Sequence, residues 1–187
     1  MNILITGCKG YIGTVLTEFL QQKNYSIKGI DNSYYNNCLL DKDSHNFEFI
    51  QKDIRDLNVK DITNIDTIIH LAALSNDPLG EFNPNLTENI NYHSTINLAN
   101  LSKEVGLKRF VYISSQSMYG ISDTLDELEE DNSIKNPVTR YASTKWEAEK
   151  KLKEINNGDY DLVCLRPSTV FGVSPRLRCD IVFNNLV

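Results

Sequence analysis

The stretch NILITGCKGYIG, Asn2–Gly13, decides the fold that the rest of the sequence predicts. Its first residues, Asn2–Thr6, form a short, mostly apolar run with β-branched side chains, which is typical of a buried strand. The run is stopped by Gly7, the first of three glycines in the spacing G-x-x-G-x-x-G. From Tyr11 to Gln22, apolar residues recur at helical intervals. The chain therefore begins with a strand, a tight glycine turn and a helix.

Short apolar runs continue to alternate with helical patterns along the chain. Further strands are predicted at Ser26–Ile30, Phe47–Gln51, within Asp66–Leu74, Arg109–Ser115 and Asp161–Arg166. Longer helices are predicted at Leu86–Val105 and Val138–Ile155. Strands that alternate with helices pair in parallel through right-handed crossovers, so the predicted fold class is α/β, a doubly wound, mostly parallel sheet of Rossmann-like type.

The composition is typical of a globular protein in water and argues against two classes of partner. The 187 residues carry a net charge of -6 without a cluster of Lys and Arg, which disfavours a nucleic-acid surface. No apolar run approaches the length of a membrane span. Met1 leads straight into the first strand without a basic leader, and the 4 cysteines are scattered. We therefore expect a cytoplasmic protein with reduced thiols, not a disulfide framework.

The glycine turn and the end of the second strand together indicate a dinucleotide site. Gly7, Gly10 and Gly13 lie where a backbone without side chains can approach a pyrophosphate, whose charge the helix N-terminus stabilises. Asp31 ends the second strand, and a carboxylate there can accept hydrogen bonds from ribose hydroxyls while repelling a 2′-phosphate. An ordinary loop aspartate is the alternative, but both features together favour NAD over NADP.

Tyr141 and Lys145 lie four residues apart, and so on one face of the predicted helix Val138–Ile155. This spacing fits a catalytic pair in which the lysine lowers the pKa of the tyrosine, and it fits an ordinary surface helix equally well. The spacing alone leaves both interpretations open.

The histidines and one acidic stretch are the other features that invite a functional interpretation. His45, His70 and His93 are dispersed, and no cysteine or carboxylate completes a ligand set, so no metal site is predicted. The acidic stretch Asp123–Asn132 could bind a partner, but a solvated loop is the favoured interpretation.

Several motifs in a fixed order give the sequence a resemblance to a known family. They are TGCKGYIG, Asp31, HLAAL, FVYISS, YASTK and LRPSTVFG, and together they extend over nearly the whole chain. The sequence resembles the extended short-chain dehydrogenases/reductases, and within them the NAD-dependent epimerase/dehydratase family that acts on nucleotide-diphosphate sugars. The resemblance implies an NAD-binding Rossmann-like domain at residues 1–175 and the start of a substrate-binding region at 176–187, with the C-terminal substrate-binding part absent or truncated.

The resemblance also assigns residues to the NAD cofactor. They come from the glycine turn, the ends of the later strands and the Tyr-x-x-x-Lys helix: Gly7, Gly10, Tyr11, Ile12, Gly13, Asp31, Asn32, Asp53, Ile54, Leu71, Ala72, Ala73, Ser114, Tyr141, Lys145, Pro167 and Ser168. Asn91 falls where the family has a helix asparagine.

The catalytic trio that the resemblance implies is Ser115, Tyr141 and Lys145, which favours the catalytic interpretation of that helix. A tyrosine with an ordinary pKa near ~10 is a poor base at neutral pH. Lys145, together with the positive nicotinamide ring, would lower the pKa of Tyr141. Tyr141 would then act as general base, and Ser115 would hold the sugar hydroxyl. The substrate contacts implied are Ser115, Gln116 and Thr169.

The activity implied is that of a 4-epimerase for a nucleotide-diphosphate sugar, working through a transient 4-keto sugar. Gln116 and Ser117 stand where the 4,6-dehydratase branch has an Asp-Glu pair, which disfavours that activity. A dehydratase or reductase of the same family, and a non-catalytic NAD-binding module or fragment, are the alternatives. The family also implies a homodimer through helices that flank the sheet, with Val138–Ile155 as a candidate face.

Overall fold

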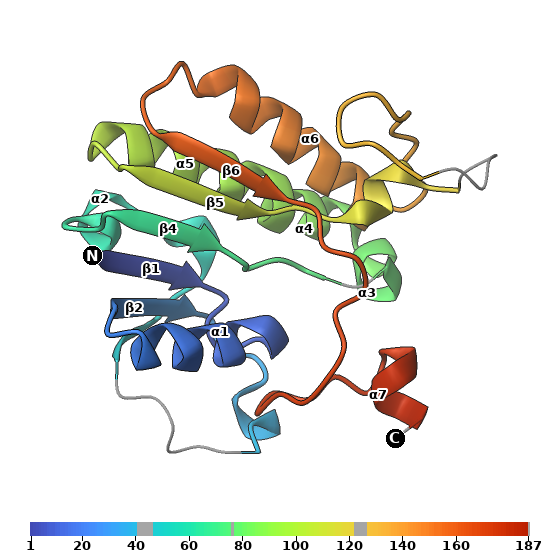
Figure 1. Ribbon diagram of the computed structural model, residues 1–187, viewed down its shortest axis with the longest axis horizontal. Coiled ribbons are helices and arrows are strands. Elements are labelled where there is room, and N and C mark those ends of the chain that lie inside the picture. The colour runs from blue at the N-terminus through green and yellow to red at the C-terminus, as the bar shows by residue number, and fades with distance from the viewer. Residues whose placement is uncertain (41–46, 76, 122–126, 187) are drawn as a thin grey trace.

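The fold is a parallel β-sheet with helices on both faces, as the sequence predicts. The computed structural model describes residues 1–40, 47–75, 77–121 and 127–186. Its 6-stranded sheet has the order β3-β2-β1-β4-β5-β6, and all pairs are parallel. The strands are β1 (Asn2–Thr6), β2 (Ser26–Asp31), β3 (Glu48–Gln51), β4 (Thr67–His70), β5 (Arg109–Ile113) and β6 (Asp161–Leu165). Because they are parallel, their carboxyl ends meet at one edge (Figure 1).

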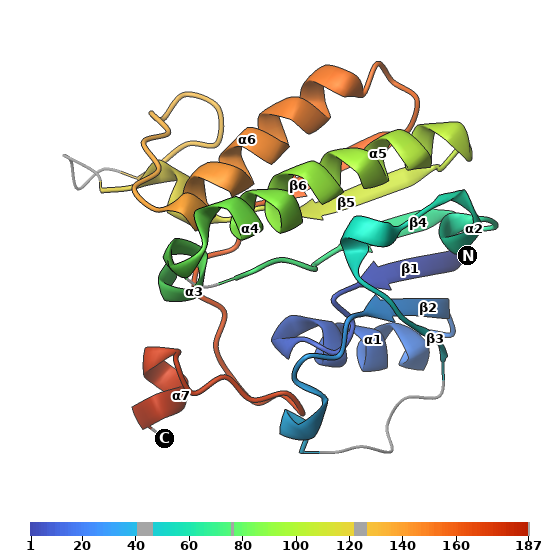
Figure 2. The same ribbon diagram turned by 180° about the vertical axis from the view of Figure 1, so that it is seen from behind.

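The helices divide between the two faces of the sheet. Those in the described residues are α1 (Tyr11–Gln22), α2 (Val59–Ile62), α3 (Asp77–Phe82), α4 (Pro84–Glu88), α5 (Ser94–Glu104), α6 (Arg140–Ile155) and α7 (Val182–Leu186). Figure 2 shows α5 and α6 over β5 and β6, where their apolar faces bury the larger core cluster with Phe110 and Tyr112. On the other face, α1 packs against Ile3 and Ile5 of β1.

One half of the face that carries α1 is left open. Val163 and Leu165 of β6 are 37% and 48% exposed, because no described helix lies over this part of the sheet. Alternating strand residues point to opposite faces, so Leu162 and Cys164 are the β6 residues that pack into the core. The double winding predicted from the sequence is therefore complete over β1 and β2 but one-sided over β6.

Most differences from the predicted elements lie at their ends. The strand predicted to reach Ser115 ends at Ile113, the last strand ends at Leu165, and the strand expected from Phe47 begins at Glu48. Thr139 caps α6 by accepting a hydrogen bond from the backbone N–H of Ala142, so that helix begins at Arg140, two residues later than predicted.

The predicted helix Leu86–Val105 proves to be a helical stretch from Pro84 to Glu104 with a π-helical turn at Asn89–His93. The short helices α2 and α3 were not predicted, because 4 and 6 residues hold too few turns to show a helical period. His45 and residues 123–126 of the acidic stretch lie outside the described residues, and residues 127–132 are exposed, as expected of a solvated loop.

His70 ends β4 and is buried at the carboxyl edge with both ring nitrogens paired. Thr95 Oγ1 donates to the carbonyl oxygen of Asn91 (2.9 Å), so it can only accept from His70 Nε2 (2.9 Å). Nδ1 then accepts from Thr6 Oγ1, 2.7 Å away. This arrangement suits a neutral imidazole, and burial, helped by the charge of Lys145, lowers the pKa of His70 to about 3.

This burial predicts an acid-dependent loss of stability. Because the folded pKa of His70 is about 3 and the unfolded value is about 6.5, only the unfolded chain binds the proton between those pH values. The stability advantage of the parent over His70→Gln should shrink by about 1.4 kcal/mol for each pH unit below about 6, measured by urea unfolding. If the free energy of unfolding fell equally with pH in the parent and in His70→Gln, this account would be contradicted.

Candidate active site

The glycine turn between β1 and α1 is shaped by two glycines that the fold itself requires. Gly7 has φ +73°, and a Cβ there would lie 2.8 Å from the backbone nitrogen of Ala72. A Cβ at Gly13 would lie 2.1 Å from the carbonyl oxygen of Gly7. A Cβ at Gly10 would have only that same oxygen within 4 Å among the described atoms, at 3.1 Å. The outer side of the turn is therefore open at Gly10.

The N-terminus of α1 begins at this open side. Gly10 is its N-cap residue, and none of the described side chains caps the helix. The first backbone N–H groups of α1, which include those of Tyr11, Ile12 and Gly13, therefore form the kind of terminus that stabilises a phosphate. The Tyr11 hydroxyl points elsewhere, donating to the carbonyl oxygen of Gly172 (2.6 Å).

Asp31 links the end of β2 to the glycine turn. Its carboxylate accepts from the backbone N–H of Lys9 (3.1 Å) and from that of Ser33 (2.8 Å). Each carboxylate oxygen has a second lone pair, so these contacts leave acceptor capacity for ribose hydroxyls. The neighbouring Asn32 accepts from the backbone N–H of Tyr34 (3.2 Å) and so shapes the same turn.

Asp53 and Ile54, the residues expected near the adenine, have protein partners. Both carboxylate oxygens of Asp53 accept from Arg55, and this hydrogen bonding holds the pKa of Asp53 below its usual range. Ile54 is buried in the larger core cluster. Their contact with adenine stays a prediction.

The segment Leu71–Ala73, which follows β4, lies between the glycine turn and the helices. Ala72 donates its N–H to Thr6 Oγ1 (3.3 Å). Asn91 holds the end of the segment, because its Oδ1 accepts from the N–H of Leu74 (2.8 Å) and its Nδ2 donates to the Leu74 carbonyl (3.1 Å).

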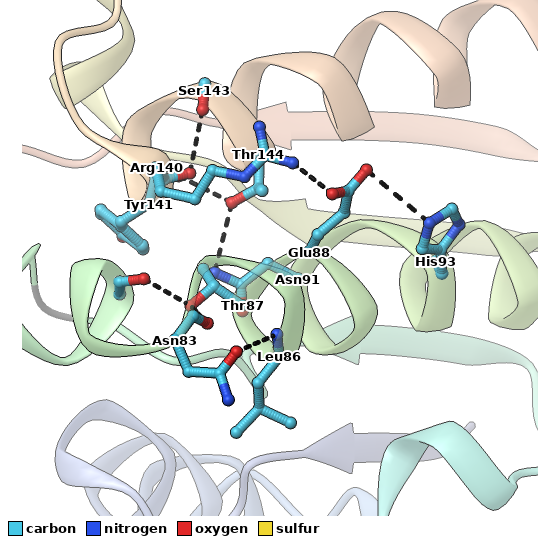
Figure 3. Close-up of polar contacts among 11 residues, drawn as sticks. Asn83, Leu86, Thr87, Glu88, Asn91, His93, Arg140, Tyr141, Ser143 and Thr144 are labelled. Atoms are coloured by element: carbon cyan, nitrogen blue, oxygen red, sulfur yellow. Dashed lines mark hydrogen bonds and ion pairs between the residues drawn. The ribbon is translucent and has the colours of Figure 1, made fainter.

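Asn91 also reaches the helix of the predicted catalytic pair. Its Nδ2 lies 3.4 Å from Thr144 Oγ1 on α6, and Figure 3 shows this amide pointing from the π-helical turn toward α6. The π-helical turn inserts an extra residue into the helix, which directs Asn91 inward. Arg140, at the start of α6, forms an ion pair with Glu88 of α4 in the same view.

Lys145 is buried at the end of β5. Its Nζ donates to the carbonyl oxygen of Ile113 (2.8 Å) and lies 5.0 Å from the centre of the Tyr112 ring. Burial lowers the pKa of Lys145 to about 7. The amine is therefore close to an even mixture of its charged and neutral forms at neutral pH.

Tyr141 lies one turn before Lys145 and is enclosed by an element that the sequence did not reveal. Gly80 of α3 packs against it, since a Cβ at Gly80 would lie 3.4 Å from the Cβ of Tyr141. Burial raises the pKa of Tyr141, and hydrogen bonding with the Ser115 side chain opposes that rise.

Both groups are desolvated, which disfavours the phenolate and the ammonium alike, and the Lys145 amine is directed at a backbone carbonyl. The lowering of the Tyr141 pKa by Lys145 together with the positive nicotinamide ring stays a prediction for the NAD-bound protein. The catalytic roles of Tyr141, Lys145 and Ser115 stay a prediction as well.

Ser115 begins the short 3-10 helix η4 (Gln116–Tyr119) as its N-cap. Its hydroxyl accepts from the backbone N–H of Ser117 (3.1 Å) and donates to Ser117 Oγ (3.0 Å). The preceding Ser114 is buried, and its N–H donates to the carbonyl oxygen of Leu165 (2.7 Å).

The chain after β6 borders the same edge of the sheet. Pro167 accepts at its carbonyl from the N–H of Gln116 (3.2 Å), so these two segments run together. Gln116, Ser168 and Thr169, which the family resemblance assigns to substrate and cofactor, are exposed there.

Farther on, the chain is fastened to α1 by contacts that no local sequence pattern revealed. Ser174 Oγ donates to the carbonyl oxygen of Tyr11 (2.8 Å) and lies 3.1 Å from Thr14 Oγ1. Figure 1 shows this segment running from the end of β6 past α3 to the start of α1. The predicted boundary at residue 175 remains a prediction.

The described residues offer neither a metal site nor a membrane span. Within the described residues, no group of three or more His, Cys, Asp and Glu side chains could hold a metal ion. The described helices are all too short or too polar to cross a membrane.

The sheet order, the glycine turn and the Tyr-x-x-x-Lys helix together are those of a Rossmann-like dinucleotide-binding domain. The model of the NAD dependent epimerase/dehydratase family matches residues 3–183. The chain belongs to that family, which confirms at family level the prediction of NAD as cofactor.

Relatives of the chain include both epimerases and dehydratases. It is 31% identical to a UDP-glucuronate 4-epimerase of Thermodesulfobacterium geofontis, over 92% of this chain and 57% of the relative. It is 30% identical to a dTDP-D-glucose 4,6-dehydratase of Mus musculus, over 91% of this chain and 51% of the relative.

Among solved structures, MoeE5 in complex with UDP-glucuronic acid and NAD has a TM-score of 0.86. The two chains are 27% identical over 100% of this chain and 60% of that structure. The chain thus spans between about half and three fifths of the length of these relatives.

The different packing of the glycines predicts different effects of substitution. Gly10→Val should fold, because its backbone is extended and its outer side is open, but its NAD affinity should fall at least about tenfold, or ~1.4 kcal/mol. Gly13→Ala should lose fold stability, because its Cβ would overlap a backbone oxygen. Thermal unfolding and calorimetric NAD titration measure the two effects. A Gly10→Val variant that binds NAD like the parent would exclude the turn from the site.

Proposed function

We propose that this chain provides the cofactor-binding and proton-transfer part of an NAD-dependent 4-epimerase for nucleotide-diphosphate sugars. The observation that carries the proposal is the convergence of Tyr141, Lys145 and Ser115 at the carboxyl ends of β5 and β6. Lys145 is tied to the Ile113 carbonyl, two residues before Ser115, and the Ser115 side chain opposes the rise in the pKa of Tyr141. These residues come from two elements that are far apart in sequence, so a surface helix alone does not explain their arrangement.

The glycine turn offers NAD an open backbone surface. The open side of Gly10 and the N-terminus of α1 would receive the pyrophosphate, and Asp31 would accept from the ribose hydroxyls. When bound, NAD supplies the group that takes a hydride from the sugar and returns it, and its oxidised ring carries a positive charge. Lys145, which is buried beside the end of β5, would hold the nicotinamide ribose.

Tyr141 would accept the proton of the sugar hydroxyl on its phenolic oxygen. Because burial raises its pKa, the phenol needs a nearby positive charge to ionise at neutral pH. Protonated Lys145 supplies one such charge, and its pKa of about 7 lets it change protonation near physiological pH. The Ser115 hydroxyl would hold the sugar oxygen while the proton moves to Tyr141. The same groups return the proton after the 4-keto sugar has presented its other face.

Two residues favour an epimerase over a 4,6-dehydratase. Gln116 is exposed and has no acidic group, and the Ser117 hydroxyl is engaged by Ser115. Neither can act as the acid or base that elimination of water needs. A reductase or another dehydratase of the family would use the same catalytic trio. The proposal concerns nucleotide-diphosphate sugars as a class, and it includes a homodimer that forms through α6.

The proposal predicts different effects for the two members of the pair. Tyr141→Phe should reduce epimerisation of UDP-glucuronate or UDP-glucose by about two to four orders of magnitude while NAD affinity stays within about threefold. Lys145→Met should lower both turnover and NAD affinity, the latter by at least about tenfold. Sugar products are followed by NMR and NAD binding by calorimetry.

Tyr25→Phe, at the opposite end of the sheet, is the matched control and should behave like the parent. Absorbance of NADH should not accumulate during turnover, because an epimerase returns the hydride to the same sugar. Near-normal turnover of Tyr141→Phe would disprove the proposed mechanism.

A further inference from the structure

Glu149 is a fully buried carboxylate on the same face of α6 as the catalytic pair. It follows Lys145 by four residues and Tyr141 by eight, which are spacings of one and two helical turns. Its oxygens accept from Arg166 Nε (3.1 Å) and Arg166 Nη2 (2.6 Å). The two planar groups therefore meet edge to edge, a geometry that fixes their orientation as well as their distance.

Arg166 extends this contact to a second part of the site. Its Nη1 donates to the Tyr119 hydroxyl (2.7 Å) and also to the carbonyl oxygen of Glu130. Its guanidinium lies 5.6 Å from the centre of the Tyr119 ring and 5.8 Å from that of Trp146. Arg166 directly follows β6, so one side chain joins the end of β6 to α6 and to the loop after β5.

Tyr119 brings the loop that carries Ser115 into this network. Tyr119 is the last residue of η4, and Ser115 is the N-cap of the same short helix. Met118 between them is buried, which anchors η4 from its other side. Arg166 thus joins one end of η4 to α6, and Ser115 lies at the other end of η4.

The ion pair is suited to setting a geometry more than to adding stability. Burial opposes ionisation of Glu149, but hydrogen bonds from Arg166 and Lys153 outweigh it and hold the pKa of Glu149 low. Buried ion pairs cost desolvation, and apolar residues of similar volume often stabilise a fold as well. What apolar residues cannot supply is the set of directed hydrogen bonds to Glu149 and Tyr119 at once.

We propose that Arg166, acting through Glu149 and Tyr119, is a positioning residue that sets where η4, and with it Ser115, lies relative to Tyr141 on α6. Its own hydrogen bonds go to Glu149, Tyr119 and the Glu130 carbonyl, so it acts through these residues. The role matters for catalysis only if the proposed function holds, but the positioning itself can be tested without substrate.

The test measures how far a substitution at Ser115 shifts the NMR resonance of the Tyr141 side chain. With the tyrosine ring carbon that bears the hydroxyl labelled with ¹³C, the Tyr141 resonance is assigned by its loss in Tyr141→Phe. Ser115→Ala should displace this resonance in the parent, because it removes a hydrogen-bond partner. In Arg166→Gln the displacement caused by Ser115→Ala should be at least about threefold smaller. Tyr119→Phe, which removes one hydroxyl and is the milder change, should reduce it in the same direction.

Lys153→Met is the matched control. Lys153 also binds Glu149, at 3.0 Å, but it is half exposed and has no contact with η4 among the described residues. In Lys153→Met, the displacement of the Tyr141 resonance caused by Ser115→Ala should therefore be the same as in the parent. Equal displacements in the parent, Arg166→Gln and Tyr119→Phe would overturn the proposal, and Tyr119→Phe alone decides if Arg166→Gln does not fold. Because the measurement uses neither NAD nor sugar, failure of the proposed function leaves its result interpretable.

Discussion

The hydrogen bond from Lys145 Nζ to the Ile113 carbonyl is the contact on which the site depends. A buried amine is costly unless it is hydrogen-bonded, so this bond fixes the depth at which α6 meets the end of β5. Asn91 holds α6 through Thr144 and Arg166 holds it through Glu149, on either side of that point. The helix is thus fastened to the sheet along the face that carries Tyr141.

This fastening also determines how far the pair is buried. A spacing of four residues predicts that two side chains share a face, but it does not predict how much water reaches them. Gly80 of the unpredicted helix α3 packs against Tyr141, and Lys145 is buried beside the end of β5. Burial raises the pKa of Tyr141 and lowers that of Lys145, so it favours the neutral form of each side chain.

The fold could be predicted because its signals are local and repeated. Apolar runs mark each strand, and the helical periods of α1, α5 and α6 fix the alternation that makes the sheet parallel. The π-helical turn at Asn89–His93 leaves the helical pattern almost unchanged, so its effect on Asn91 was missed. Contacts such as Tyr11 with Gly172 and Glu149 with Arg166 join residues distant in sequence through one or two hydrogen bonds. Such contacts leave no periodic pattern in the sequence from which they could be predicted.

The buried and exposed residues of the site carry different parts of its chemistry. Ser115 and Lys145 are buried near the end of β5, where a substitution disturbs several neighbours at once. Gln116, Ser168 and Thr169 are exposed at the open side, where side chains can change at little cost to the fold. Family membership therefore supports NAD as the cofactor, and under the proposed function the choice between epimerisation and dehydration would rest on Gln116 and Ser117 beside Ser115.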